Sequence, residues 1–495
     1  MEDNDQVKIR RERLDGLRSR GLSPYVNRYK PSHRIAHLLK EHAGRPAEDL
    51  EKLAPQVKIA GRLMSIRGHG KTIFGHVQDG SAKIQVYARV DETADFDDVK
   101  KLDMGDIVAG EGTLFYTKTG ELTVRATRLF LLTKSLSPLP EKWHGLKDVE
   151  TRYRQRYVDL ISNDEVREVF VKRAKVISAI RRYLDSMEFL EVETPMMQPI
   201  PGGAAARPFV THHNALDMQL YMRVAPELYL KRLIVGGYDR VYEINRNFRN
   251  EGISTMHNPE FTMLEFYMAY VDYNDLMTMS EKMLSSVAME VCGTTSLNWM
   301  GHDIELGGEW RRCAFFEAIE TIGGVPKDVV DDHDKAREWL KARGVTAEKA
   351  GKGAKVWEKL FEVAVEPHLV QPTFIYDFPL ELSPLAKTKE GAPHLVERFE
   401  LYIGCKELAN AYTELNDPDD QLRRFKEQAG LRDAGDAEAQ WMDLDYVTAL
   451  EYGMPPTGGE GIGIDRLAML LTGQDSIREV ILFPLLKIQK PDQEN

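Results

Sequence analysis

The sequence predicts an α+β protein in which a small β-barrel is followed by a larger domain with a mostly antiparallel sheet flanked by helices. Three observations predict this fold class. Five short runs with a period of two lie between residues 57 and 134. An amphipathic helix pattern follows at Asp164–Met187. Further strand patterns then recur at irregular spacings, with few short βαβ units, which favours antiparallel pairing.

Composition and cysteine usage define the broad class. The 495 residues are 42% hydrophobic and 29% charged, which is typical of a globular protein of several domains. Cys292, Cys313 and Cys405 lie far apart, which argues against a disulfide framework or a zinc cluster. We find no signal-peptide pattern in Met1–Arg20 and no apolar run of membrane-spanning length. We therefore expect a cytoplasmic location and no membrane segment.

Two arginine clusters leave the question of nucleic-acid contact open. The net charge of −12 argues against nonspecific coating of nucleic acid, but not against a local basic face. A charge cluster is usually a solvated helix face. Tyr153 and Tyr157 interleave with the second cluster, so a nucleic-acid contact there is about as plausible. The clusters are Arg10, Arg11, Arg13, Arg18 and Arg20, then Arg152, Arg154 and Arg156.

Residues 1–56 are predicted to be helical and residues 57–134 to form the barrel. Five strands in so compact a segment suggest an OB-fold, which binds single-stranded oligonucleotides by stacking bases on aromatic side chains. Phe74 and Tyr87 are candidates, although each alone is more often a core residue than a stacking platform. Gly70-Lys71-Thr72 lacks the spacing of a phosphate loop and is predicted to be a hairpin turn. The expected strands are 57–66, 72–78, 83–88, 106–116 and 122–132.

A linker is predicted at 135–156, where Pro138, Pro140 and Gly145 interrupt regular patterns. The second domain is then 157–495, with a charged helical insertion at about 314–367.

The stretch Phe248–Tyr267 is predicted to be strand, long loop and strand. In the second strand, Glu265 shares a face with Phe261 and Tyr267, and carboxylates are rarely buried without a partner. The alternative is a surface hairpin with ordinary charges.

Two further stretches carry candidate chemistry. Glu400 lies in an apolar strand, and Glu407 follows a turn at Gly404. Whether Glu407 begins a helix or a strand, the carboxylates converge and call for a cation, for which a divalent ion bound to substrate phosphates is suitable. The glycine-rich run Gly458–Gly463 precedes Arg466 at a predicted strand-to-helix junction, where an anionic phosphate is favoured. A small-residue run, Gly202–Ala206, is either a close backbone approach to a ligand or a flexible loop.

Three ordered motifs resemble those of class II aminoacyl-tRNA synthetases. The segments 202–209, 225–232, 249–270 and 407–418 are similar to lysyl-tRNA synthetases in particular, and the similarity covers nearly the whole chain, barrel included. The class I signatures HIGH and KMSKS are absent. The motifs are Thr194-Pro195 after the long helix, Phe248-Arg249-Asn250-Glu251 with His257 and Phe261, and Gly461-x-Gly463-x-Asp465-Arg466.

The resemblance implies an ATP site and a class II catalytic domain behind an OB-fold anticodon-binding domain. The implied catalytic residues are Arg249, which would bridge the amino-acid carboxylate and the ATP α-phosphate, and Arg466, which would clamp the far phosphate. Phe261 would stack on adenine. Glu400 and Glu407 would hold Mg²⁺. The implied ATP-binding residues are Arg249, Glu251, His257, Phe261, Glu400, Glu407 and Arg466.

The resemblance also implies an L-lysine site and an anticodon site. Carboxylates beyond the metal pair suit a substrate with two ammonium groups, whereas an aspartate-specific relative needs a cationic pocket. We expect no spare arginine or lysine at these positions. The implied lysine-binding residues are Gly203, Glu227, Arg249, Glu265, Tyr267, Asn410 and Glu414. The implied anticodon-binding residues are Arg67, Phe74, Gln85 and Glu121.

The leading hypothesis is a homodimeric ligase that activates L-lysine as lysyl-adenylate and transfers it to the 3′ end of tRNA(Lys). One alternative is a catalytically retired or repurposed synthetase-like RNA-binding protein, which should have lost motif arginines or metal carboxylates. Another is a ligase that lysylates proteins, but such relatives lack the barrel.

Overall fold

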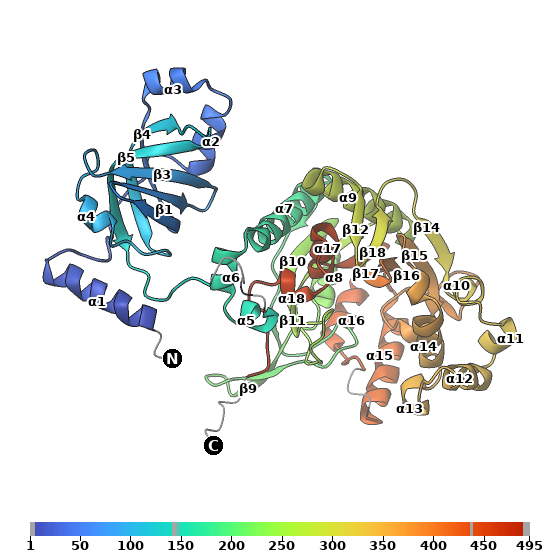
Figure 1. Cartoon of the computed structure of the whole chain (residues 1–495). Coiled ribbons are helices and arrows are strands. Elements are labelled where there is room, and N and C mark those ends of the chain that lie inside the picture. The colour runs from blue at the N-terminus through green and yellow to red at the C-terminus, as the bar shows by residue number, and fades with distance from the viewer. Residues whose placement is uncertain (1–4, 141–145, 147, 436–438, 489–495) are drawn as a thin grey trace. The chain divides into compact units, whose positions relative to one another are not determined.

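The structure is a computed structural model, and it describes residues 5–140, 146, 148–435 and 439–488. The chain divides into two compact units, Met1–Lys147 and Asp148–Asn495 (Figure 1). The predicted linker at 135–156 falls partly outside the described residues. Its last part contains the helix α5 (Val149–Arg154), which belongs to the second unit. No helix in the described ranges is long and apolar enough to cross a membrane.

The first unit is built on a closed five-stranded barrel, as predicted. Strand β1 pairs with β2 and β4, and β3 pairs with β5 in parallel, which gives the order β1-β2-β3-β5-β4. Gly70 has φ +57° in the β1–β2 turn, so Gly70-Lys71-Thr72 is the predicted hairpin turn. The strands are β1 (Gln56–His69), β2 (Thr72–Gln78), β3 (Lys83–Arg89), β4 (Ile107–Tyr116) and β5 (Leu122–Thr133).

Helices pack around the barrel, and one arginine of the first basic cluster anchors the first of them, α1. Arg10 is 6% exposed, and its guanidinium donates to the carbonyl oxygens of Met104 (2.9 Å), Ser135 (3.2 Å) and Ser137 (3.2 Å). Arg10 is therefore a structural residue and not part of a solvated face. The helices are α1 (Asp5–Ser19), α2 (Ile35–His42), α3 (Ala47–Leu53) and α4 (Phe96–Val99).

The second unit is organised around a mixed, mostly antiparallel sheet with the order β14-β15-β16-β17-β18-β11-β10-β6. The pairs β14/β15 and β10/β6 are parallel and the other pairs are antiparallel. The strands are β6 (Leu190–Glu191), β10 (Arg240–Phe248), β11 (Glu260–Ala269), β14 (Arg311–Ala314), β15 (Thr373–Pro379), β16 (Leu395–Ile403), β17 (Lys406–Thr413) and β18 (Thr457–Gly463).

Three helices cover one face of this sheet: α7 (Asp164–Ser186), α9 (Tyr273–Cys292) and α17 (Ile464–Thr472) (Figure 1). Their apolar faces form one core with alternate strand residues such as Leu264 and Phe266. Because side chains alternate along a strand, the neighbouring Glu265 lies on the other face. The packing of these helices against one face of the sheet thus leaves the opposite face of β11, with Glu265, outside this core.

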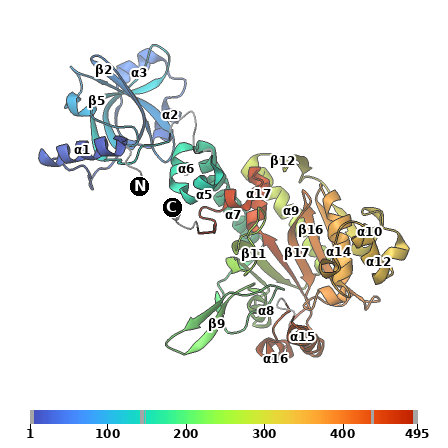
Figure 2. The ribbon, with the colours of Figure 1, turned by 60° about the horizontal axis from the view of Figure 1, so that its bottom comes forward.

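Helical segments complete the unit at the far end of the sheet. The predicted insertion at 314–367 connects the parallel strands β14 and β15, and it contains α10 (Phe315–Thr321), α11 (Lys327–Val330), α12 (His333–Lys341), α13 (Ala347–Ala350), α14 (Lys355–Ala364) and the 3₁₀ turn η1 (Glu366–His368). Helices α15 (Pro418–Asp433) and α16 (Leu444–Glu451) lie together beside α8 (Glu227–Val235), as Figure 2 shows.

The remaining elements are short. They are α6 (Arg156–Ser162), α18 (Ile477–Val480), the 3₁₀ turn η2 (Leu380–Leu382), a sheet of β7 (Met197–Gln198), β8 (Val210–His213) and β9 (Met218–Met222), and the pair β12 (Ser296–Trp299) and β13 (His302–Glu305).

The second basic cluster is largely used inside the unit. Arg156 is fully buried, pairs with Asp159 at 2.5 Å and donates to the carbonyl oxygen of Arg478. Arg152 pairs with Asp159 (3.0 Å) and Glu479 (3.1 Å). These two arginines therefore hold α5, α6 and α18 together and do not form a nucleic-acid surface.

Candidate active site

A cavity of about 630 Å³ lies against the sheet of the second unit, and its lining includes residues of β11, β16, β17 and β18. It gathers the site residues predicted for this domain, with one exception. Glu414 lies behind the lining, next to Tyr267 and Gly459. The predicted residues in the lining are Gly203, Glu227, Arg249, Glu251, His257, Phe261, Glu265, Tyr267, Glu400, Glu407, Asn410 and Arg466.

Arg249 is presented to the cavity by the end of β10. Its backbone N–H donates to the carbonyl oxygen of Pro259 (2.9 Å), which holds the ends of the β10–β11 loop together. The guanidinium lies 5.0 Å from the centroid of the Phe261 ring. Its buried Nε has no hydrogen-bond partner among the described residues. A half-buried cation with an unused buried donor is suited to an anionic ligand.

Arg466 stands at the start of α17, where its neighbour Asp465 fixes the junction. The Asp465 carboxylate accepts from the Thr262 backbone N–H (2.7 Å) and pairs with Arg173 (2.6 Å). Arg466 then reaches across to Glu407, whose carboxylate lies 3.4 Å from Nη1. A cation at a helix N-terminus, beside free backbone N–H groups, is suited to phosphate.

His257 completes this end of the cavity. Its Nε2 lies 3.3 Å from Arg466 Nη2, and its Nδ1 lies 3.0 Å from the Ser254 hydroxyl. Partial burial and the Arg466 charge lower the pKa of His257, so the imidazole is neutral at neutral pH. Glu251, also predicted here, lies on the exposed part of the same loop.

Glu400 and Glu407 lie on the neighbouring strands β16 and β17, so Glu407 begins a strand and not a helix. Burial and the Glu407 charge raise the pKa of Glu400, against the opposing effect of Arg398. Glu400 accepts from the Tyr402 hydroxyl (2.6 Å) and contacts Arg398. Two carboxylates that repel each other, at the end of the cavity that holds Arg466, are suited to a divalent cation that takes its other ligands from a substrate. In the described parts of the chain, no group of three or more His, Cys, Asp or Glu residues forms a metal site by itself.

Carboxylates gather at the opposite end, and a lysine lies among them. Glu227 is on the first turn of α8, and Glu414 directly follows β17. Lys231 Nζ lies 2.6 Å from Glu227 Oε1 and also pairs with Glu414. All three side chains are buried. The expectation that no spare lysine stands at these positions was therefore wrong, because Lys231 is one helical turn beyond Glu227 and points the same way.

The backbone at Gly203 lies close to Glu227. It has φ +89°, and a Cβ built there would lie 2.8 Å from Glu227 Cβ and 3.1 Å from Ala225 Cβ. Only glycine allows both this conformation and this approach. The backbone at Gly203 thus packs closely against α8, whereas the approach of the run Gly202–Ala206 to a ligand stays a prediction.

Glu265 lies between the two ends of the cavity. Burial and the Glu227 charge raise the pKa of its carboxyl to about 8. The Tyr267 hydroxyl donates to Glu265 at 3.4 Å. A carboxyl kept neutral in this way gains most from a ligand that brings a positive charge.

Asn410 belongs to a chain of polar contacts that connects the two ends. Its carbonyl oxygen accepts from Arg398 Nε (3.1 Å), and its amide donates to the Tyr412 hydroxyl (2.8 Å). Arg398 also contacts Glu400. The sequence analysis missed Arg398 and Tyr412. Strand alternation could have found them, since each lies two residues from a predicted site residue on the same strand.

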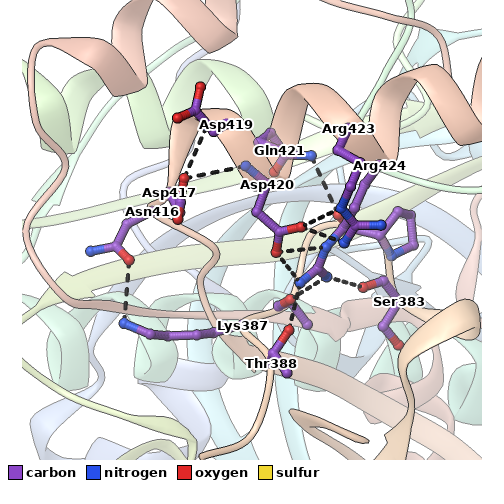
Figure 3. A network of polar contacts seen from close by, with 12 residues as sticks. Ser383, Lys387, Thr388, Asn416, Asp417, Asp419, Asp420, Gln421, Arg423 and Arg424 are labelled. Atoms are coloured by element: carbon purple, nitrogen blue, oxygen red, sulfur yellow. Dashed lines mark hydrogen bonds and ion pairs between the residues drawn. The ribbon is translucent and has the colours of Figure 1, made fainter. Parts of the chain in front are cut away.

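One wall of the cavity is held by α15. Figure 3 shows Arg424 reaching from this helix to the loop after η2. The Arg424 guanidinium donates to the carbonyl oxygen of Ala386 (2.7 Å) and to the hydroxyl of Thr388 (2.8 Å), and it pairs with Asp420 (2.6 Å). The loop residues Ser383 and Leu385 line the cavity. Arg424 therefore fixes this wall against the helix.

Of the residues predicted in the barrel, Arg67, Phe74 and Gln85 lie on the adjacent strands β1, β2 and β3, and Glu121 directly precedes β5. Gln85 donates to Glu121 (2.8 Å). The rings of Phe74 and Tyr87 lie 4.8 Å apart, and Arg67 is the strand partner of Phe74. His76, which the sequence analysis missed, contacts Glu121 at 2.9 Å. Paired aromatic rings beside polar groups could stack and hydrogen-bond to unpaired bases.

Comparisons with known proteins match both units. The family model for tRNA synthetases class II (D, K and N) matches residues 148–487, and the model for an OB-fold nucleic acid binding domain matches residues 57–132. A lysine–tRNA ligase of Pelotomaculum thermopropionicum is 54% identical over 491 residues, which are 98% of this chain and 95% of that protein. The chain belongs to the lysine–tRNA ligases of class II. A lysine–tRNA ligase of Carboxydothermus hydrogenoformans is 54% identical over 488 residues, which are 98% of this chain and 98% of that protein. One of Bacillus cytotoxicus is 52% identical over 486 residues, which are 98% of this chain and 97% of that protein.

The family match confirms the predicted fold class: an OB-fold followed by a class II synthetase domain. It does not assign roles to single residues. In this chain, the geometry brings the predicted residues together and adds Lys231, Arg398 and Tyr412 to them.

Proposed function

We propose that the chain activates L-lysine with ATP as lysyl-adenylate and transfers the lysyl group to the 3′ end of tRNA(Lys). The observation that carries this proposal is the division of a single cavity. Arg249 and Arg466 lie at one end, and the buried carboxylates of Glu227 and Glu265 lie toward the other, with Glu414 behind them. The cationic end suits a triphosphate, and the acidic end suits an amino acid with two ammonium groups.

The reaction needs no nucleophilic side chain. The lysine carboxylate attacks the α-phosphorus of ATP in line, and pyrophosphate leaves. Arg249 would contact both the carboxylate and the α-phosphate, and Arg466 the far phosphate, so that the two arginines neutralise charge where it develops. Phe261 would stack on adenine beneath the Arg249 guanidinium. Glu251 and His257 would contact the adenine and phosphate ends.

Mg²⁺ is part of this proposal. Glu400 and Glu407 would hold it, because these two carboxylates lie at the phosphate end and repel each other without a cation. When bound, the ion would add charge neutralisation at the phosphates. Arg398 keeps Glu400 in place for this role.

The residues at the acidic end of the cavity would bind the amino-acid substrate. Glu227 and the backbone at Gly203 would receive the α-amino group, with Glu265 beside them. Glu414 and Tyr267 would receive the side-chain ammonium. Asn410, held by Arg398 and Tyr412, would support the orientation of the substrate.

The tRNA and assembly proposals rest on other parts of the chain. In the barrel, Arg67, Phe74, Gln85 and Glu121 would read the anticodon. A homodimer through the first motif is supported by exposed apolar side chains there, Leu190 (45% exposed) and Met197 (54% exposed). The free thiols of the three cysteines agree with a cytoplasmic location.

ATP–pyrophosphate exchange with each amino acid in turn tests the activity. We expect exchange with lysine. Exchange with aspartate or asparagine but not lysine would contradict the proposal. Charging of purified tRNA(Lys) tests the second step, and tRNA binding without exchange for any amino acid would favour the retired RNA-binding alternative. The cavity argues against that alternative, since its arginines and carboxylates are all in place.

A further inference from the structure

Lys231 is a fully buried cation at the acidic end of the cavity. Its ammonium contacts Glu227 on the preceding turn of α8 and Glu414 beyond the end of β17. One side chain therefore connects the two carboxylates proposed for the two ammonium groups of the substrate. A buried ion pair that loses one partner leaves an uncompensated charge, which is strongly unfavourable.

The other charged and titratable groups around Lys231 do not replace it. The Tyr446 ring on α16 lies with its centroid 5.9 Å from the ammonium. Arg232, the next residue of α8, turns away to Asp443 (2.7 Å) and Asp445 (3.1 Å). Glu265, Tyr267 and Tyr412 face the same carboxylates from β11 and β17.

The two carboxylates depend on Lys231 for their charge. Burial alone raises the pKa of both Glu227 and Glu414. The Lys231 ammonium lowers both pKa values, whereas the Glu227 charge raises that of Glu414 further. Without Lys231, two like charges would be buried side by side, so that at least one would take up a proton.

The Glu414 carboxylate still has lone pairs that its ion pair with Lys231 does not use. Neither oxygen of Glu414 has a hydrogen-bond partner among the described residues, although one of them is ion-paired with Lys231. A carboxylate has about four lone-pair sites. Lys231 therefore leaves lone pairs of Glu414 unused, although Glu414 itself lies behind the cavity lining.

We propose that Lys231 is a positioning residue that holds Glu227 and Glu414 as carboxylates, at a fixed separation, for the two ammonium groups of the amino-acid substrate. This inference rests on the proposed function. Lys231 acts through the two glutamates, so its removal should weaken lysine binding and leave ATP binding unchanged.

The variant Lys231→Met tests this in lysine-dependent ATP–pyrophosphate exchange, because methionine has a similar length and no charge. We expect KM for lysine to rise at least about tenfold, since a buried charge pair is broken. KM for ATP should stay within about twofold. The glutamates should also protonate at higher pH, so the acid limb of kcat/KM for lysine should move to higher pH. An unchanged KM for lysine with an unmoved acid limb in folded Lys231→Met overturns the inference.

Arg232→Met is the matched control. It removes a cation and its ion pairs from the adjacent position of α8, and it should leave KM for lysine and the pH profile unchanged. An equal rise of KM in both variants would mean that α8 is merely destabilised, which also overturns the inference.

A second comparison serves if Lys231→Met does not fold. The double variant Lys231→Met/Glu414→Gln removes one carboxylate together with its cation. Compared with Glu414→Gln alone, it should show a higher KM for lysine and an acid limb at higher pH, because Glu227 has lost its counter-ion. Equal values in the two variants overturn the inference.

The wild-type protein separates this inference from the function on which it rests. Lysine-dependent exchange in the wild type, with no effect of Lys231→Met, contradicts only the role of Lys231. The absence of lysine-dependent exchange in the wild type contradicts the proposed function itself, and the inference with it.

Discussion

Gly459 offers a sharp test of the amino-acid end, because a single methyl group there would enter occupied space. Gly459 is the strand partner of Tyr267 on β11 and of Tyr412 on β17. A Cβ built at Gly459 would lie 2.2 Å from Glu414 Oε1 and 2.3 Å from Tyr267 Cε1. Real Cβ atoms do not approach other atoms so closely. Gly459→Ala must therefore displace both side chains.

The expected size of the effect follows from the cost of overpacking. Both neighbours are buried, Glu414 with 1% and Tyr267 with 3% exposed, so neither can move into solvent. Extra methyl groups in a packed interior cost about 1–3 kcal/mol. If this cost falls on the lysine-bound state, KM for lysine rises by about 5- to 150-fold, because about 1.4 kcal/mol corresponds to a factor of ten.

Steady-state ATP–pyrophosphate exchange with varied lysine, and separately with varied ATP, measures this effect. Gly430→Ala is the matched control, since a Cβ at Gly430 on the exposed side of α15 has no atom within 4 Å. We expect the control to match the wild type in both KM values. A KM for lysine within twofold of the wild-type value in folded Gly459→Ala would refute the placement of Glu414 and Tyr267 at the lysine ammonium.

Other perturbations separate the steps of the reaction. Arg249→Ala should lower the rate of exchange about 100- to 1,000-fold, as expected when a preorganised electrostatic contact is lost, with circular dichroism unchanged. Phe74→Ala should lower kcat/KM for tRNA about 5- to 150-fold, because stacking on one base contributes about 1–3 kcal/mol, and should leave exchange unchanged. Burial raises the pKa of Glu460 from 4.5 to about 8, and Ser280 is its hydrogen-bond partner. Between pH 4.5 and about 8, Glu460 ionises in the unfolded chain but stays protonated in the folded protein. The folded protein therefore loses stability as pH rises through this range. Glu460→Gln should raise Tm more at pH 8 than at pH 5; equal gains at both would contradict this.

The fold could be predicted from the sequence where the local spacing of apolar residues is also the spacing of the residues buried in the folded protein. The barrel strands have a period of two and are separated by turns, and each predicted strand overlaps an observed one. The long helix α7 was predicted because its apolar spacing is the spacing of its buried face. Pairing between distant strands, such as β14 with β15, could not be predicted. It depends on contacts across the intervening helices, which leave no local pattern.

The candidate site could be predicted as a set of residues but not as a network. Glu265 was conspicuous as a carboxylate within an apolar strand, and Arg249 as an arginine at the mouth of the loop that precedes it. Arg398 was missed because an arginine in a strand is usually exposed. Strand alternation places it on the face of Glu400, and the register of β16 with β17 brings it close to Asn410. Arg10 and Arg156 were misleading for a related reason, since a sequence does not show that an arginine is buried against backbone carbonyls.

Lys231 at first contradicts a pocket for a dicationic amino acid, but the charges of the acidic end resolve this. Glu265 is largely neutral in the empty site, because burial raises the pKa of its carboxyl to about 8, and it ionises when a ligand brings a positive charge. With a dicationic substrate bound, Glu227, Glu265 and Glu414 would supply three negative charges and Lys231 one positive charge, which leaves two negative charges for the two ammonium groups of lysine. Arg249 is then left for the substrate carboxylate. An acidic side chain would face a net negative site, whereas a lysine completes it. A buried lysine therefore sharpens the selection of a lysine substrate, because it keeps the carboxylates charged without neutralising all of them.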